Sequence, residues 1–148
     1  MTVDEDLRDV QGKVFLIPFA NDAFILAQVG FGGDLGIFRG TYSKDIEPAR
    51  LNPPLLFRVH FGRVSPSNFN WIDCGTFPYK GALQKPQAYV HRPIGLDECT
   101  LVTFGGKDEP ISCYEASRYE PLATWSHEHI LRRFEEEGRS YPEHDDDS

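Results

Sequence analysis

The chain has 148 residues, of which 40% are hydrophobic, so it can bury the core of one domain. Its 11 Phe, 6 Tyr, 13 Gly and 11 Pro favour short strands joined by turns over a helical bundle. The start of the chain has no basic segment followed by an apolar one, and no run of about 18 apolar residues occurs anywhere, so we expect neither secretion nor a membrane span.

The cysteine content points to a reducing compartment. Cys74, Cys99 and Cys113 are odd in number and widely spaced, which does not fit a disulfide framework. We expect them to be small buried hydrophobes in a cytoplasmic protein.

The formal net charge of −8 is carried by the two ends of the chain. Residues 1–9 hold four acidic side chains against one Arg, residues 135–148 hold seven against one, and residues 10–134 are close to neutral. A nucleic-acid-binding protein would concentrate Lys and Arg on one face, whereas the basic residues here are scattered. No nucleic-acid partner and no membrane partner are therefore expected.

The first predicted element is a β-hairpin over residues 12–31. Two apolar runs, 13–19 and 23–31, are separated by a turn that contains Asn21 and Asp22. Both faces of the first run are apolar, which is typical of a strand in the middle of a sheet with other layers on both sides. We expect this hairpin to be the structural centre of the domain.

Further strands are expected after the hairpin. Residues 35–42 predict the third strand, and the proline-rich residues 43–54 predict a long surface loop. Residues 55–61 alternate, with Arg58 and His60 on the second face, which indicates a half-exposed strand. The remaining predicted strands are residues 71–77, 87–92 and 99–104.

Helical signals begin near the C-terminal end. Ser112 and Glu115 have the spacing of a capping box, which predicts a short helix to about residue 119. Ser126 is placed to cap a second helix over residues 127–137, whose apolar side chains have the spacing of a buried stripe. The whole pattern predicts a mainly β (α+β) fold: an antiparallel sheet or partly open barrel of six or seven strands with one or two C-terminal helices.

A single domain is expected over residues 12–138. An acidic N-terminal segment, residues 1–11, precedes it, and residues 139–148 are expected to be a mobile acidic tail because they offer nothing to bury.

No motif predicts a catalytic, cofactor-binding or metal-binding residue. His127 and His129 belong to the densest histidine cluster, but side chains two apart on a helix point about 200° apart and cannot share one ion. The chain has no G-x-S-x-G motif, and its glycine-rich pieces lack the Lys and Ser/Thr of a phosphate-binding loop.

Aromatic and acidic side chains are the candidates for contact with a protein partner. Surface aromatic residues anchor protein interfaces, and an acidic tail can steer a basic partner. Trp125, which lies just before the amphipathic helix, is instead expected in the core. The predicted partner-binding residues are Trp71, Asp73, Tyr79, Tyr89, Glu143, Asp145 and Asp146.

Three motifs in order, spread over residues 12–136, carry a family resemblance. They are Gly12-Lys13-Val14-Phe15 with Ile17-Pro18 and Gln28-Val29; Trp71-Ile72-Asp73-Cys74-Gly75 with Pro78 and Leu83; and Glu115, Glu120 and Trp125 with Ile130-Leu131-Arg132-Arg133-Phe134. In this order the chain resembles the immunity protein 26 family of bacterial polymorphic toxin systems. The Asn21-Asp22 turn without a glycine and the length of the 43–54 loop depart from that pattern.

The resemblance implies a mostly β domain without catalytic duty that binds a cognate toxin and blocks it. Relatives are also grouped under a phosphotriesterase-like name, so a metal-dependent hydrolase is the alternative, although such an enzyme needs clustered His and carboxylate ligands. A non-catalytic structural or regulatory adaptor is the third hypothesis. Nothing in the pattern predicts the toxin's identity or an oligomeric state.

Overall fold

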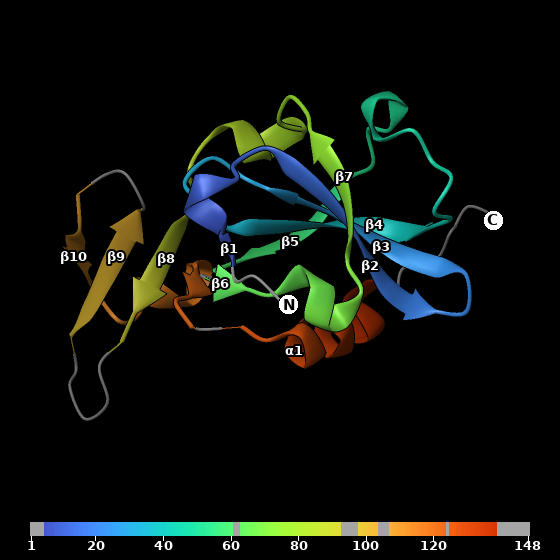
Figure 1. The fold of residues 1–148 in the computed structure, drawn as a ribbon. Helices are drawn as coiled ribbons and strands as arrows, with labels where there is room; N and C mark the ends of the chain where they lie inside the picture. Colours follow the sequence, from blue (N-terminus) through green and yellow to red (C-terminus); the bar gives the residue numbers. More distant parts are fainter. Residues whose placement is uncertain (1–4, 61–62, 93–97, 104–106, 124, 139–148) are drawn as a thin grey trace.

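A five-stranded sheet is the centre of the fold in the computed structural model, which describes residues 5–60, 63–92, 98–103, 107–123 and 125–138. Neighbouring strands run antiparallel in the order β5-β4-β3-β2-β7 (Figure 1). These strands are β2 (Lys13–Ala20), β3 (Ala23–Val29), β4 (Leu35–Tyr42), β5 (Leu55–Val59) and β7 (Ile72–Thr76).

A smaller sheet lies at one end of the large one (Figure 1). Its order is β10-β9-β8-β11, and all pairs are antiparallel except β8 with β11. Its strands are β8 (Ala88–His91), β9 (Cys99–Thr103), β10 (Glu109–Ile111) and β11 (Glu120–Pro121). A separate pair joins β1 (Glu5–Asp6) to β6 (Arg63–Val64).

The helical elements are short. Helix α1 (His127–Arg133) is continued by a π-helical turn, Phe134–Gly138. No helix in the described residues is long and apolar enough to cross a membrane. The 3₁₀ turns are Leu7–Asp9, Pro48–Arg50, Pro66–Phe69, Gly81–Gln84 and Glu115–Arg118.

The mainly β fold predicted from the sequence is confirmed, and each of its seven expected strands is present. The structure adds four strands of two or three residues, β1, β6, β10 and β11, which are too short to give a periodic pattern. The expected cap at Ser126 is formed, since its hydroxyl accepts a hydrogen bond from the His129 amide at 3.3 Å. The Ser112 hydroxyl accepts from the Glu115 amide at 3.1 Å, but the element that follows is a 3₁₀ turn whose N-cap residue is Tyr114.

The hairpin is buried on both faces, as its sequence predicted. Phe15 and Ile17 of β2 point into one apolar cluster, and Val14 and Leu16 point into another on the opposite face. The tight turn between β2 and β3 places Asp22 at φ 56°, a left-handed conformation that Asp tolerates better than most residues with a Cβ.

Different elements cover the two faces of the large sheet. Helix α1 covers one face with Ile130, and Phe134 of the π-helical turn packs beside it. Leu83 and half-buried side chains of the 43–54 loop cover the other face. The Lys80 ammonium group also holds this loop against the core, because it donates hydrogen bonds to the carbonyls of Pro48 and Leu51, each at 2.6 Å.

A buried polar cluster joins the two sheets. Asp34 forms an ion pair with Arg58 of β5 at 2.9 Å and accepts a hydrogen bond from the Tyr89 hydroxyl of β8 at 2.6 Å. Burial is the main cause that raises the pKa of Tyr89, and the negative charge of Asp34 raises it further, so the hydroxyl keeps its proton and remains a donor. The cluster fixes β8 against the large sheet.

Arg58 corrects the expectation of a half-exposed strand at residues 55–61. Its side chain is only 3% exposed, although the alternating pattern placed it toward solvent. The buried charge is tolerated because Asp34 neutralises it and the carbonyls of Ala82 and Lys85 accept hydrogen bonds from its Nη1 at 3.1 and 2.8 Å.

The N-terminal boundary predicted at residue 12 is also wrong. Leu7 is fully buried in the core cluster beneath α1, and Gly33 packs directly on the backbone of Arg8. A Cβ at Gly33 would lie 2.5 Å from the Arg8 side chain, and its φ of 93° favours glycine. Part of the acidic segment thus belongs to the domain, whereas the tail at 139–148 lies outside the described residues.

Candidate functional site

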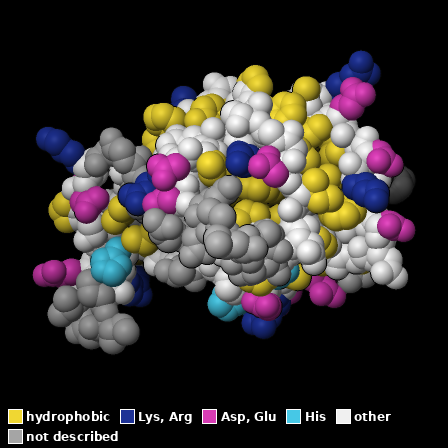
Figure 2. All heavy atoms as spheres, viewed as in Figure 1, with side chains coloured by type: hydrophobic (Ala, Val, Ile, Leu, Met, Phe, Trp, Pro, Cys, Tyr) yellow, Lys and Arg dark blue, Asp and Glu magenta, His cyan; other side chains and the backbone are white. Residues whose placement is uncertain are grey.

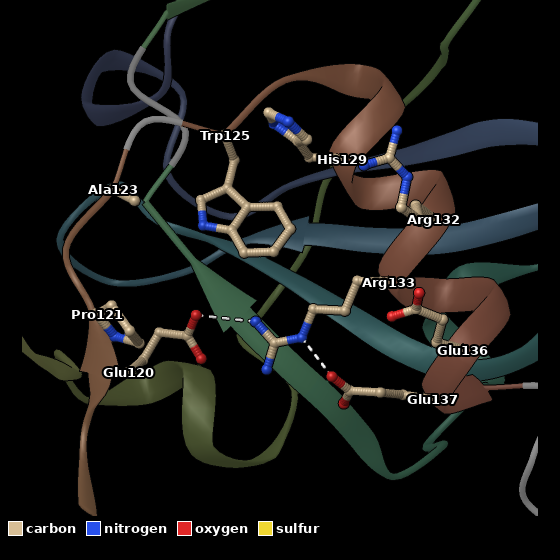
Figure 3. Close-up of a pocket in the computed structure, with 9 residues that line it drawn as sticks. All are labelled: Glu120, Pro121, Ala123, Trp125, His129, Arg132, Arg133, Glu136 and Glu137. Carbon is tan, nitrogen blue, oxygen red and sulfur yellow. Dashed lines mark hydrogen bonds and ion pairs between the residues drawn. The ribbon is translucent and has the colours of Figure 1, made fainter. Parts of the chain in front are cut away.

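The strongest candidate site is a cleft of about 530 Å³ between α1 and the segment that leads into it (Figure 3). Charged side chains of both signs surround a half-buried indole ring. The cleft is lined by Glu120, Pro121, Ala123, Trp125, His129, Arg132, Arg133, Glu136 and Glu137.

The amphipathic pattern of α1 explains why its polar side chains face the cleft. Ile130 and Phe134 are buried against the sheet, which fixes the rotation of the helix. His129, Arg132 and Glu136 then follow one another at helical spacing on the side that borders the cleft. The cap by Ser126 fixes where the helix begins.

Arg133 is the central side chain of the cleft. Its guanidinium group lies 4.2 Å from the Phe57 ring centre and 5.4 Å from the Trp125 ring centre. It also forms ion pairs with Glu120 at 2.8 Å and Glu137 at 2.6 Å (Figure 3). Burial opposes the charge, but the two carboxylates outweigh it and raise the pKa of Arg133, so its positive charge is permanent.

Trp125 gives the cleft its apolar wall. The indole is half-buried: it packs beside Phe57 with ring centres 6.3 Å apart, and His129 meets it edge-on at 5.9 Å. The sequence placed Trp125 in the core, and the structure shows that it also faces the cleft, because the chain turns into α1 at the next residue. An aromatic surface flanked by charges can bind a side chain that carries both apolar and polar parts.

The polar groups near His129 serve local structure. Ser126 Oγ caps α1 and lies 3.0 Å from His129 Nδ1, so this hydroxyl has two partners within its own helical turn. Within the described ranges, no group of three or more His, Cys, Asp or Glu side chains is arranged to hold a metal ion.

Two of the predicted partner-binding residues are buried, so the expectation that they lie on the surface is wrong. Trp71 is 6% exposed, and its indole N–H donates a hydrogen bond to His127 Nδ1 at 3.1 Å. Tyr89 is fully buried in the cluster that joins the two sheets. Both rings complete the core and use their polar atom internally.

Asp73 and Tyr79 do not line the cleft. Asp73 is half-exposed on β7 and forms an ion pair with Lys13 at 3.0 Å. Tyr79 packs with the apolar cluster on the sheet face opposite α1, edge-on to the exposed ring of Phe31 at 6.3 Å. Glu143, Asp145 and Asp146 lie outside the described residues.

Charged side chains of both signs are interspersed on the face shown in Figure 2, and the described residues there form no patch of one sign. The fold and the cleft define a mainly β domain with a recessed groove of mixed charge. No family model, curated protein or solved structure matches the chain.

Proposed function

We propose that this chain is an immunity protein that binds and neutralises a cognate bacterial toxin domain through the cleft beside α1. The observation that carries the proposal is the Trp125 and Arg133 pair at the centre of a recessed, open groove. Trp and Arg are among the residues that contribute most binding energy at protein interfaces, above all where the surrounding surface excludes water.

The packing of the pair supports a binding role. Phe57 lies against both the guanidinium group of Arg133 and the indole of Trp125, so these side chains are held in place before a partner arrives. Binding then costs little additional side-chain entropy. The groove therefore resembles a pre-formed interface more than a flexible surface.

The charges in the cleft suit a protein partner. Glu120 and Glu137 both pair with Arg133, while Arg132 and Glu136 are exposed at the rim. A rim that carries both signs of charge can complement an equally mixed protein surface and discriminate against partners with the opposite arrangement. The lining has three carboxylates against two guanidinium groups, so it offers no net positive charge to a polyanion.

The resemblance noted in the sequence adds a second line of support. Glu120, Trp125, Arg132 and Arg133 belong to its third motif, and all four line the same cleft. The buried stripe of α1 needs only its apolar positions, so it does not require any of these four identities.

The test is protection in cells. A toxin domain encoded beside this gene is expressed with the wild-type chain, with Trp125→Ala, or with Tyr114→Ala as a matched control. Tyr114 is 85% exposed and lies outside the cleft. We expect survival with the wild type and the control and loss of survival with Trp125→Ala at equal protein levels.

Two outcomes would overturn the proposal. One is that the wild-type chain neither binds the neighbouring toxin nor protects against it. The other is zinc-dependent turnover of an organophosphate by the purified chain that a chelator abolishes, which would instead support a hydrolase.

A further inference from the structure

Two thiols and an arginine meet in the smaller sheet. Arg92 directly follows β8, Cys99 begins β9, and Cys113 lies two residues after β10. The register pairs His91 with Thr100 and Ile111 with Cys99, so antiparallel pairing brings the three side chains to the same end of the sheet. All three cysteines of the chain are present as thiols.

Arg92 bridges the two cysteines. Its Nε donates a hydrogen bond to Cys99 Sγ at 3.3 Å, and its Nη2 donates to the Cys113 carbonyl at 3.2 Å. Cys113 also packs against the small apolar cluster that contains Cys99. The guanidinium group of Arg92, which is always charged, thus lies against the Cys99 sulfur and the backbone of Cys113.

The surroundings favour a negative charge on the Cys99 sulfur. The hydrogen bond from Cys113 and next Arg92 lower the pKa of Cys99, although burial opposes them. Cys74 is the opposite case: burial raises the pKa of its thiol, and the negative charge of Asp73 raises it further. The chain therefore contains one activated thiol, Cys99, with Cys113 beside it, and Cys74 serves as an internal reference thiol.

Two simpler explanations account for the site less well. Cys99 is 2% exposed and could serve only as a small core residue, but packing alone does not explain a guanidinium group that donates to its sulfur. A metal site would need further ligands, none of which is grouped with these thiols in the described residues, and Arg92 would repel a cation.

We propose that Cys99 and Cys113 form a redox-active dithiol that a peroxide converts reversibly into an intramolecular disulfide. Cys99, whose sulfur accepts the hydrogen bond from Arg92, is the thiolate that attacks the peroxide. Cys113, the more exposed thiol, then closes the bond.

The reaction balances without another reagent. The Cys99 thiolate attacks one peroxide oxygen, the O–O bond breaks, and Cys99 sulfenic acid and hydroxide form. The hydroxide takes the proton of Cys113 and becomes water. The Cys113 thiolate then attacks the Cys99 sulfur, the S–S bond forms, and the displaced hydroxide leaves as a second water after taking the proton that Cys99 first released.

The experiment treats the full chain with one equivalent of hydrogen peroxide at neutral pH, then counts thiols in denaturant and maps disulfides by mass spectrometry. We expect two of the three thiols to disappear, the mass to fall by about 2 Da as two hydrogen atoms are lost, a peptide pair that joins Cys99 to Cys113, and full reversal by dithiothreitol. Cys74 should remain reduced under these conditions.

Variants separate activation by Arg92 from mere proximity. For each unit by which the pKa of the attacking thiol rises, its thiolate fraction at neutral pH falls about tenfold, while the nucleophilicity of the thiolate rises about threefold. Arg92→Gln should therefore slow oxidation by roughly a factor of three for each unit by which it raises this pKa. Arg50→Gln, which removes a highly exposed arginine that pairs with Glu47, is the matched control and should leave the rate unchanged.

Three results would overturn the proposal: oxidation of Cys74 as fast as that of the pair, over-oxidation of single thiols without a Cys99–Cys113 disulfide, or an unchanged rate in Arg92→Gln. The first two are measured on the wild-type chain, so they do not depend on whether a variant folds.

Discussion

The Tyr89 hydroxyl shows how one buried polar atom contributes to the fold. It donates to Asp34, whose other partner is Arg58, and all three side chains are nearly inaccessible. Tyr89→Phe removes this donor without changing the packing, and we expect a loss of about 2 kcal/mol in the free energy of unfolding, measured by urea denaturation. Tyr114→Phe, at a highly exposed position, should change it by less than about 0.5 kcal/mol.

His127 should make stability depend on pH. Its ring stacks on Phe69 with centres 4.4 Å apart and accepts the hydrogen bond from Trp71 through Nδ1, which requires the neutral form. Burial lowers the pKa of His127 in the folded state, while in the unfolded chain it returns to about 6.5. The unfolded chain thus binds more protons, so this contribution is complete above pH 6.5 and is lost as the pH falls toward the lower folded pKa.

The measurement is the free energy of unfolding at pH 7.5 and pH 5.5 for the wild type and for His127→Phe. Phe keeps the stack on Phe69 but cannot be protonated, so the difference between the two pH values should shrink. His60, whose pKa burial also lowers, should account for part of what remains. An unchanged difference in His127→Phe would show that His127 does not carry the dependence.

The cap of α1 sets the stability of that element. Ser126→Ala removes the acceptor for the His129 amide, and we expect a loss of about 1 kcal/mol in thermal or urea unfolding. Ser43→Ala, at an exposed position outside helices and strands, is the control. Equal effects of the two substitutions would contradict a capping role.

The strong elements were predictable because each satisfies several local rules. Apolar side chains on both faces of β2 indicate a central strand. The spacing of Ser126, Ile130 and Phe134 indicates a capped helix with one buried face. Elements such as β1 and β11 were not predictable, because two residues carry no period and their pairing depends on distant partners.

The cleft was predictable only in part. The Trp125 indole and the two arginines of α1 stand out in the sequence, but nothing local shows that Phe57 of β5 packs on Arg133 or that Glu120 of β11 pairs with it. For the same reason the sequence does not show that Trp71 and Tyr89 are buried in the folded protein. Contacts between distant segments decide which aromatic residues are exposed.

At the scale of the whole molecule, the acidic C-terminal end should influence the rate of association. If residues 139–148 steer a basic partner, deleting them lowers the association rate by a factor of roughly 2 to 10 at low salt and leaves the dissociation rate unchanged. Stopped-flow binding at several ionic strengths measures both rates. An unchanged salt dependence of the association rate would contradict this role.

We propose that a toxin domain binds in the cleft around Trp125 and Arg133. The most direct test of this claim is the Kd of the purified toxin domain for the wild-type chain, Trp125→Ala and Tyr114→Ala, measured by titration calorimetry. We predict that Trp125→Ala weakens binding by at least about 30-fold, which corresponds to about 2 kcal/mol, while Tyr114→Ala stays within about twofold. Equal Kd values for the wild type and a correctly folded Trp125→Ala variant would contradict the claim.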